Sequence, residues 1–462
     1  MSGLNDLLQL SGSGLRAYQN QINVFSNNIA NVNTDGYSRR SLELETGIPD
    51  EGLGTGVQSG EVVRIYNIMG RNALLQELPN AGYHSEMSTY LSDLESLLGG
   101  GAGGLDQALA DFEAALQDAA ASPEDLAART VLLQSASTLA SEFNQLDSAL
   151  AQVESLWGSM EDAVGEFNAL AAQLQDLNRN ITRAEAAGRS VPDLLDERDQ
   201  LVQELALQAN VTVSPDYGIT LGGQELVSAD GLSRQELAVD AADTFSVGGT
   251  DITAAVTGGK LAARGAAADT AVALQDQLNS LAGTLIAEVN AVFDNAYNLN
   301  GERPADLGYT FFTGTDAGDI AVDVSLYDPA DPMGARPERV ALAATRADDG
   351  PPPVPNAGDN TAGLLLSDTL EGALSGLDGQ SLSGFWIQVE TTLGGAVNEE
   401  TQLAASSAGV VEMFDNQMLS VSGVNLDEEL LNLMSAQKAY EACARVMSTA
   451  NSLLDTLIDL GR

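Results

Sequence analysis

The sequence predicts a mainly α-helical protein that carries a small β insertion. Three observations lead to this prediction. Apolar residues follow heptad patterns at both ends, long Ala/Leu/Gln-rich stretches with a helical period lie between them, and short β-like runs cluster within residues 211–259. With 462 residues and 44% hydrophobic content, the chain is long enough to bury a core. Aromatic residues make up only 5%, so we expect that core to consist mainly of Ala, Leu and Val.

The N-terminal helix is predicted from apolar residues that recur at alternating steps of four and three. The series is Leu4, Leu8, Ser11, Leu15, Tyr18, Ile22, Phe25, Ile29 and Val32. This spacing is typical of a coiled-coil helix with a narrow apolar seam. The opposite face is rich in Asn, a poor helix former, so we expect the helix to be ordered only when its seam is packed. The turn-forming Thr34-Asp35-Gly36 then ends it.

The C-terminal helix is predicted from the same spacing over nearly five heptads. The series is Leu426, Leu430, Leu433, Gln437, Tyr440, Ala444, Met447, Asn451, Leu454 and Ile458. Ser422 or Asn425 is expected to cap this helix, and three acidic residues follow in its first turn, where the helix dipole favours negative charge. The single cysteine, Cys443, lies on or beside the seam and is interpreted as a packing residue.

Two interpretations of these terminal helices are open from the periodicity alone. They are either ordinary amphipathic helices that pack on a core, or they pair with each other and with neighbouring copies of the chain. The second is favoured because the ends of most globular proteins lack such a pattern. On this hypothesis, residues 1–45 and 421–462 form one coiled-coil domain.

Between the ends, the pattern indicates a helical domain with one β insertion. Helices are expected over 62–98 with a break near Pro79, and over 105–120, 123–186, 193–209, 260–298 and 384–420. The predicted domains are 46–210, 260–298 and 361–420 for the helical part, 211–259 for a β-meander and 299–360 for a loop-rich segment. The glycine run at 99–104 lacks the Lys of a phosphate-binding loop and is interpreted as a connection between helices.

The composition argues against several classes of function. The formal charge is -46 and Lys occurs only at Lys260 and Lys438, which disfavours binding to nucleic acid or to an anionic membrane surface. One Cys and one His, His84, leave little scope for a zinc site or a His-dependent nucleophile. The acidic residues of 196–199 suit acid–base chemistry on paper, but with Arg198 among them a solvated helix face is the favoured interpretation. No catalytic residue, cofactor or metal ligand is predicted.

The negative charge is unevenly distributed along the chain. Residues 1–45 carry a net charge of -1 and residues 421–462 carry -3, so the middle of the chain holds the remaining -42. Charge that is removed from water without a partner is costly. Nearly neutral ends therefore suit helices that pack against helices, while the acidic middle suits surfaces that face solvent.

Two terminal motifs and one internal motif resemble a known family. The segment from Ser26 to Arg40, with Asn28, Asn31, Thr34, Gly36 and Tyr37, resembles the signature of bacterial flagellar rod, hook and hook-associated axial proteins. The segment 420–429 resembles the start of their C-terminal helix. The internal stretch 192–202 narrows the resemblance to the hook-associated FlgK family. The resemblance covers about 1–300 and 360–462, and Asp35 stands where the signature usually has Pro.

The resemblance implies a structural role without catalysis or cofactor. Proteins of this family join hook to filament, assemble as a ring through paired terminal helices, and contact the hook protein and a second junction protein, FlgL. The resemblance also implies export by the flagellar type III apparatus, a location outside the cell at the hook–filament junction, and a cytoplasmic FlgN-like chaperone at the C-terminal helix. The lack of a basic and an apolar region after Met1 agrees with export without a cleaved signal. Residues 299–360 are too short for the large outer β domain of many relatives, so a reduced outer region is expected.

Three other interpretations are weighed against this one. The nearest is another axial protein such as the hook subunit, which shares the terminal motifs. A secreted hydrolase that uses paired carboxylates and a soluble surface adhesin are the others, although the sequence shows no motif for a catalytic cleft. The apolar positions of the two seams, together with the signature residues Asn28, Asn31, Thr34, Gly36 and Tyr37, are the predicted assembly site.

Overall fold

The computed structural model describes residues 2–46, 56–99, 104–331, 334–348 and 354–460. Its contacts divide the chain into two compact units. The first comprises 1–83, 160–262 and 404–462, and the second comprises 84–159 and 263–403. Three long helices contribute to both units: α2 (Ile68–Leu98), α7 (Gly259–Phe293) and α10 (Leu382–Ser422). The mainly α prediction is confirmed, whereas the finer division into four domains stays a prediction.

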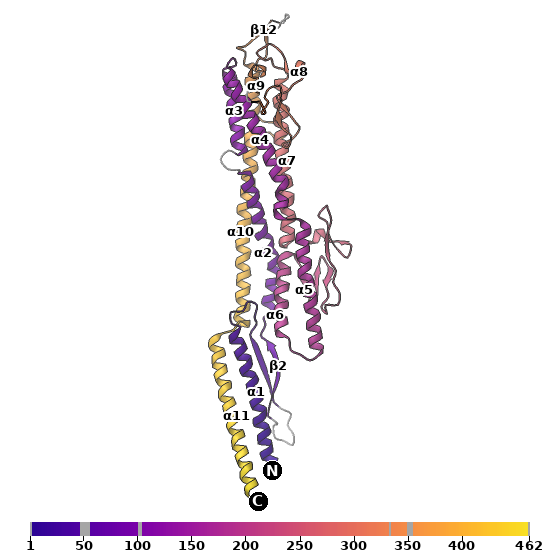
Figure 1. Cartoon of the computed structure of the whole chain (residues 1–462), viewed down its shortest axis with the longest axis vertical. Coiled ribbons are helices and arrows are strands. Elements are labelled where there is room, and N and C mark those ends of the chain that lie inside the picture. Colours follow the sequence, from indigo (N-terminus) through magenta and orange to yellow (C-terminus); the bar gives the residue numbers. More distant parts are fainter. Residues whose placement is uncertain (1, 47–55, 100–103, 332–333, 349–353, 461–462) are drawn as a thin grey trace. The chain divides into compact units, whose positions relative to one another are not determined.

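The first unit contains both ends of the chain. Helix α1 (Ser2–Ala30) lies alongside α11 (Leu426–Leu460), as Figure 1 shows in indigo and yellow. The antiparallel hairpin of β1 (Arg40–Thr46) and β2 (Val57–Arg64) also contacts α1. The unit is completed by α5 (Met160–Ala186), α6 (Pro192–Gln208) and the β insertion. The hairpin was not predicted, since residues 46–61 were assigned to the helical domain and 62–64 to a helix.

The β insertion forms two small antiparallel sheets rather than one meander. The first has the order β3 (Thr212–Val213), β4 (Ile219–Leu221) and β5 (Gln224–Val227). The second has the order β6 (Leu237–Val239), β7 (Phe245–Val247) and β8 (Thr250–Asp251). Gly222, Gly223, Gly248 and Gly249 have positive φ angles in the two-residue hairpin turns, the conformation that glycine favours. Together these strands fall within the range expected for the insertion.

A hydrophobic core in the first unit holds α2, α5 and α6 against the strands. Its buried members come from these elements and from the start of α7, and include Leu74, Leu78, Phe167, Leu174, Val202, Leu205, Ile219, Leu226, Val247 and Leu261. Pro79 does not break α2, contrary to the prediction, and the helix continues to Leu98. Gly82 lets α2 approach α6 closely, because a Cβ there would lie 2.2 Å from the carbonyl oxygen of Leu207.

The second unit is a helical bundle with a loop-rich end. It contains α3 (Leu105–Ala121), α4 (Leu126–Trp157), α8 (Pro304–Leu307) and α9 (Thr361–Glu371), with parts of α2, α7 and α10. Short 3-10 turns occur at Thr253–Ala255 in the first unit and at Pro337–Arg339 and Ser375–Leu377 in the second. Two-stranded sheets pair β9 (Phe312–Thr313) with β10 (Ala321–Val322) and β11 (Arg346–Asp348) with β12 (Val354–Pro355). The connection between α2 and α3 is the predicted glycine run, of which 100–103 lie outside the described residues.

The single helix predicted over 123–186 is two helices, and the cause is visible at their junction. Gly158 ends α4 with a φ angle of 84°, a conformation that other residues rarely adopt. Arg264 on α7 donates hydrogen bonds to the carbonyl oxygens of Trp157 and Gly158. A basic side chain therefore satisfies the last carbonyls of α4, which have no partner within the helix.

Asp359 connects the start of α9 to the loop before β11 by hydrogen bonds. The pH dependence of these hydrogen bonds can be tested. Its carboxylate accepts hydrogen bonds from the N–H and hydroxyl groups of Thr345 and Thr361, at 2.7 to 3.0 Å. Burial opposes ionisation, but these hydrogen bonds outweigh it and lower the pKa of Asp359 to about 2. Because the folded-state pKa lies below the unfolded value, this stabilisation is complete above about pH 4 and is lost as the pH falls towards 2.

We therefore expect Asp359→Asn to speed amide hydrogen exchange at Thr345 and Thr361 at pH 6, with a difference from the natural chain that shrinks as the pH approaches 2. Hydrogen exchange measured by mass spectrometry checks this. Asp368→Asn makes the same charge change on the exposed face of α9 and should leave exchange unchanged. An equal effect of Asp359→Asn at all pH values would contradict the assignment.

Candidate assembly site

The two terminal helices pack through small residues more than through the large apolar ones of the predicted seams. The most buried positions of α1 are Ser11, Gly14, Ala17, Val24 and Asn28, and those of α11 are Glu429, Ala436 and Ala450. The small side chains among them, at Ser11, Gly14, Ala17, Ala436 and Ala450, let two helix backbones approach closely.

The glycines of α1 show this close approach directly. A Cβ at Gly14 would lie 3.0 Å from Sγ of Cys443, and one at Gly12 would lie 3.4 Å from Cε of Met447. Cys443 is half-buried beside Gly14 and packs between the helices, as its position in the sequence suggested. Two glycines, which carry no apolar signal in the heptad pattern, therefore lie directly against residues of α11.

The predicted seam residues fall into two classes. Half-buried in the structure are Leu4, Leu8, Leu15, Tyr18, Ile22, Phe25, Ile29, Val32, Leu433, Tyr440, Met447 and Leu454. Leu426, Leu430 and Ile458 are instead 43%, 46% and 55% exposed. The structure thus half-buries most of the predicted seam and leaves three positions of the α11 series more exposed to solvent.

Asn28 is the polar centre of the coil and is fully buried. Its side-chain oxygen accepts hydrogen bonds from the hydroxyl of Tyr37 (2.9 Å) and the N–H of Arg40 (3.0 Å). Its side-chain nitrogen donates to the carbonyl of Arg40 (2.9 Å) and to the carboxylate of Glu429 (2.9 Å). The amide therefore uses all its hydrogen-bonding capacity and joins α1, the first residue of β1 and the first turn of α11.

The other signature residues shape the turn after α1. Asn31 accepts from the hydroxyl of Thr34 (3.2 Å), and the backbone N–H of Tyr37 donates to the carbonyl of Thr34 (3.2 Å). Gly36 has a φ angle of 73°, so the predicted turn is confirmed. Gln200 of α6 donates to the carbonyl of Asp35 (2.9 Å), and a Cβ at Gly36 would lie 2.1 Å from that amide nitrogen. The turn is therefore packed directly against α6.

A buried network of ion pairs continues from β1 and β2 to α6. Arg40 pairs with Asp193, and one of its nitrogens lies 3.7 Å from Asp196. Arg64 bonds Asp196 at 3.0 Å and Asp199 at 2.7 Å. Burial disfavours the charge of Arg64, but the two carboxylates outweigh this and raise its pKa. Ion pairs thus connect the β1–β2 hairpin, which begins at the last residue of the N-terminal signature, to α6, which carries the internal motif.

Aromatic rings and two further arginines complete the network. The hydroxyl of Tyr217 donates to Asp199 at 2.7 Å and lies 3.1 Å from the hydroxyl of Tyr66. The guanidinium groups of Arg71 and Arg198 stack on the Tyr217 ring, 4.6 and 3.4 Å from its centroid. Burial, together with the negative charge of Asp199, raises the pKa of Tyr66 and keeps its phenol neutral.

The interpretation of residues 196–199 as a solvated helix face is wrong for three of the four. Asp196 and Arg198 are 7% and 8% exposed, and the side chain of Asp199 is 12% exposed, while Glu197 faces solvent as expected. The reason is that α6 faces the arginines of β1, β2 and α2, which are more than 100 residues distant in sequence. Periodicity within one helix does not reveal such partners.

The two helices of the site begin in different ways. Asn425 caps α11, since its side chain accepts from the N–H groups of Asp427 (3.0 Å) and Glu428 (3.4 Å). Pro192 begins α6, and no side chain caps that helix. Ser190, just before it, donates instead to the carbonyl of Val62 on β2 (2.8 Å).

Among the described residues, no cluster of three or more His, Cys, Asp or Glu side chains is arranged to hold a metal ion. The helices of the described ranges include none with the length and apolar character to cross a membrane. The arrangement is that of a packing and ion-pairing interface that couples the terminal coil to α6.

Comparison with known protein families gives three matches along the chain. The model described as the flagellar hook-associated protein FlgK helical domain matches residues 91–312. A flagella basal body rod protein model matches 8–37, and a flagellar basal body rod FlgEFG C-terminal model matches 415–460. The terminal matches are to rod proteins, so the helical domain is the part that distinguishes FlgK from other axial proteins.

Comparisons over the whole chain also match flagellar hook-associated proteins. Flagellar hook-associated protein 1 of Bacillus subtilis is 26% identical, with 98% of this chain and 97% of that protein covered. The protein of the same name from Salmonella typhimurium is 25% identical over 99% of this chain and all of its own length. The solved structure of the flagellar hook junction protein FlgK from Burkholderia pseudomallei covers 76% of this chain with a TM-score of 0.59 at 17% identity, which supports the fold.

Proposed function

We propose that the chain is a member of the flagellar hook-associated protein 1 (FlgK) family, a structural subunit that assembles as a ring through its terminal helices and connects the flagellar hook to the filament. The family is structural, and we infer that this chain performs no catalysis and binds no cofactor. Hook protein on one side and a second junction protein, FlgL, on the filament side are its expected neighbours.

The observation that carries this proposal is the apolar surface that α11 leaves exposed. Leu430, Leu431, Leu453 and Leu457 are each 46% to 63% exposed, although they lie on a helix that already packs against α1. Large apolar side chains that stay exposed to water near both ends of one helix are typical of an interaction surface. Packing against α1 and α11 of adjacent subunits would bury these side chains, which gives the terminal coil a role in assembly beyond the fold of one chain.

The same surface supports two further parts of the proposal. Before assembly, exposed leucines on α11 favour aggregation, so a cytoplasmic FlgN-like chaperone that covers this helix fits the structure. We also infer that the chain is exported to the outside of the cell by the flagellar type III apparatus and resides at the hook–filament junction.

An aspartate at an exposed leucine of α11 tests the role in assembly. We expect Leu430→Asp to abolish filament attachment and swimming while lowering the stability of the isolated chain by only about 1 kcal/mol, because the Leu430 side chain is nearly half exposed in the single chain. Asn432→Asp introduces the same charge on an exposed position of the same helix and should leave motility intact. Swimming assays, electron microscopy and urea unfolding make the measurement. Full filaments on the Leu430→Asp strain would contradict the proposal.

A deletion strain separates the junction role from that of a hook subunit, the nearest alternative. Loss of a junction protein leaves hooks without filaments and releases filament subunits into the medium. Loss of the hook subunit leaves no hook at all. A zymogram on peptidoglycan with the purified chain tests the inference that the protein is not a hydrolase.

A further inference from the structure

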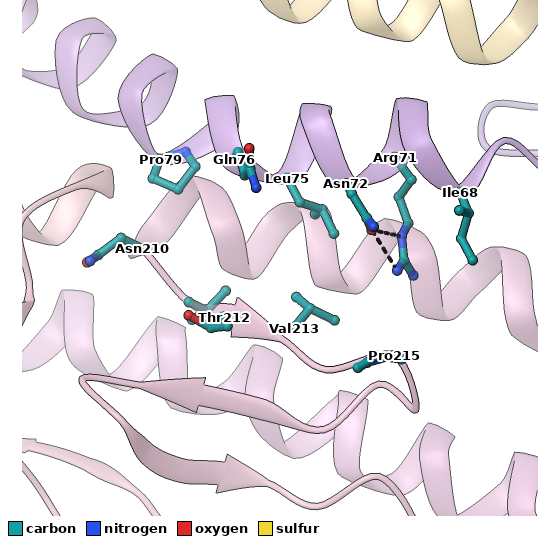
Figure 2. Close-up of a pocket in the computed structure, with 11 residues that line it drawn as sticks. Ile68, Arg71, Asn72, Leu75, Gln76, Pro79, Asn210, Thr212, Val213 and Pro215 are labelled. Carbon is teal, nitrogen blue, oxygen red and sulfur yellow. Dashed lines mark hydrogen bonds between the residues drawn. The ribbon is translucent and has the colours of Figure 1, made fainter.

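A groove of about 500 Å³ lies in the first unit between α2 and strand β3 (Figure 2). Its lining includes Ile68, Arg71, Asn72 and Leu75 from α2, and Thr212 and Val213 from β3. The volume falls within the roughly 300–1,000 Å³ typical of ligand sites. Ile68, at one end of the groove, is 58% exposed, so the apolar lining continues onto the surface.

One wall of the groove is the free edge of a β-sheet. In the sheet order β3-β4-β5, β3 pairs on one side only. Ser214 donates its N–H to the carbonyl of Gly218 (2.9 Å), which makes these residues a hydrogen-bonded pair of the ladder. Bonded and non-bonded pairs alternate along antiparallel strands, so Val213, opposite Ile219, directs its N–H and C=O away from β4. Figure 2 shows β3 between α2 and the other strands of its sheet, so this edge faces the groove.

The other wall of the groove carries the guanidinium group of Arg71, whose Nε–Nη2 side donates to an amide rather than to a carboxylate. Arg71 is 5% exposed, and its Nε and Nη2 both donate to the single side-chain oxygen of Asn72, at 3.3 and 3.0 Å. Its Nη1 has no hydrogen-bond partner among the residues that the structure describes, since Asp199 lies 3.6 Å away. The Nε–Nη2 side of an arginine fits the two oxygens of a carboxylate, and such charged hydrogen bonds are about twice as strong as neutral ones. The exposed Asn72 amide thus occupies the place that a carboxylate would take.

The charge of the groove differs from that of the chain as a whole. None of its lining residues is acidic, although the chain carries 66 acidic residues. The first turn of α2, which forms one end of the groove, is also free of acid, so the positive end of the helix dipole is not neutralised there. An acidic ligand group is therefore favoured in this groove and disfavoured over most of the chain.

We propose that this groove binds an extended peptide segment, which adds to the free edge of β3 as a further strand and places a carboxylate on Arg71. Backbone hydrogen bonds to Val213 give affinity, as they do wherever a peptide extends a sheet. Alternate apolar side chains of the segment pack on Leu75 and Ile68. The carboxylate displaces the Asn72 amide from Arg71 and selects acidic over neutral segments. This inference concerns the ligand of the groove and does not depend on the junction role.

A random eight-residue peptide library displayed on phage and selected on the folded full chain tests the proposal. We expect enriched peptides to alternate apolar residues with at least one Asp or Glu. In fluorescence anisotropy with the synthetic peptides, changing that acid to its amide, or methylating alternate backbone nitrogens, should each weaken binding by about tenfold or more.

Two variants at the exposed Asn72 provide the matched control, because neither disturbs the core. Asn72→Asp supplies an internal carboxylate to Arg71 and should weaken binding of the acidic peptide about tenfold, whereas Asn72→Ala vacates the site and should bind it at least as tightly as the natural chain. Circular dichroism checks that both fold. The proposal is overturned by a selection that enriches no peptide, by enriched peptides without acid, by peptides that tolerate N-methylation, or by equal binding to the Asn72→Asp variant.

Discussion

Replacing Asn28 with aspartate is expected to separate the end of α1 from the first turn of α11. The new carboxylate keeps the shape of the amide but loses both donated hydrogen bonds, and it lies within hydrogen-bonding distance of Glu429 in a site without exposure to water. An unpaired buried charge costs about 3–5 kcal/mol. Asn28→Ala removes the same bonds without adding charge and should cost less, about 2–3 kcal/mol.

Hydrogen exchange of α1 and α11 measures this effect locally. Asn28→Asp should accelerate exchange in both helices and leave α3 and α4 of the second unit unchanged. Lowering the pH should partly restore protection, since a protonated aspartate can donate to Glu429. Asn23→Ala, on an exposed face of the same helix, is the control. Protection in α11 that survives Asn28→Asp would show that the Asn28–Glu429 bond does not couple the helices.

Removing the carboxylate of Asp196 is expected to have an effect of similar size by a different route. Asp196→Ala leaves the buried guanidinium groups of Arg40 and Arg64 with fewer partners, and breaking a buried ion pair from one side costs about 3–5 kcal/mol. Glu197→Ala, at the adjacent exposed position, should change stability by only about 0.5 kcal/mol. The free energies of unfolding in urea give the comparison.

A double-mutant cycle identifies the cause of that loss. Because Arg64 and Asp196 bond directly at 3.0 Å, Arg64→Met together with Asp196→Ala should cost less than the sum of the two single changes. Apolar replacement of both members of a buried pair is often nearly neutral. Additive costs would indicate that Asp196 acts through its neighbours rather than through Arg64.

The regular elements of this chain were predictable because each is encoded locally. Both terminal helices, the β insertion, the turn at Gly36 and the long helices of the middle follow from period, glycine and capping signals within a few residues. Two predictions were wrong for local reasons: the break near Pro79 and the single helix that would have run through Gly158. Pro79 is tolerated inside α2, which tertiary packing holds together, and Gly158 breaks the predicted helix by adopting a positive φ angle.

The site was less predictable, because its determining contacts are distant in sequence. The heptad spacing identified the right helices, but it favoured large apolar residues over Gly14, Ala436 and Ala450, whose small size is what lets the helices approach. Asp196 looked solvated because its arginine partners belong to β1 and β2, in a hairpin that was not predicted. One signal in the sequence could have indicated this buried polar cluster. The N-terminal signature contains Arg and the internal motif contains Asp, and neither charge has an evident local role.

The bond between Asn28 and Glu429 joins residues 401 positions apart, and this separation has a consequence for the order of folding. A contact of such high contact order forms late, since loop closure must precede it. Helix α1 is rich in Asn and gains little stability alone, so it has to wait for α11, the last helix of the chain. The coil of α1 and α11 is therefore expected to form late in folding, after the core of the first unit has brought the two ends of the chain together.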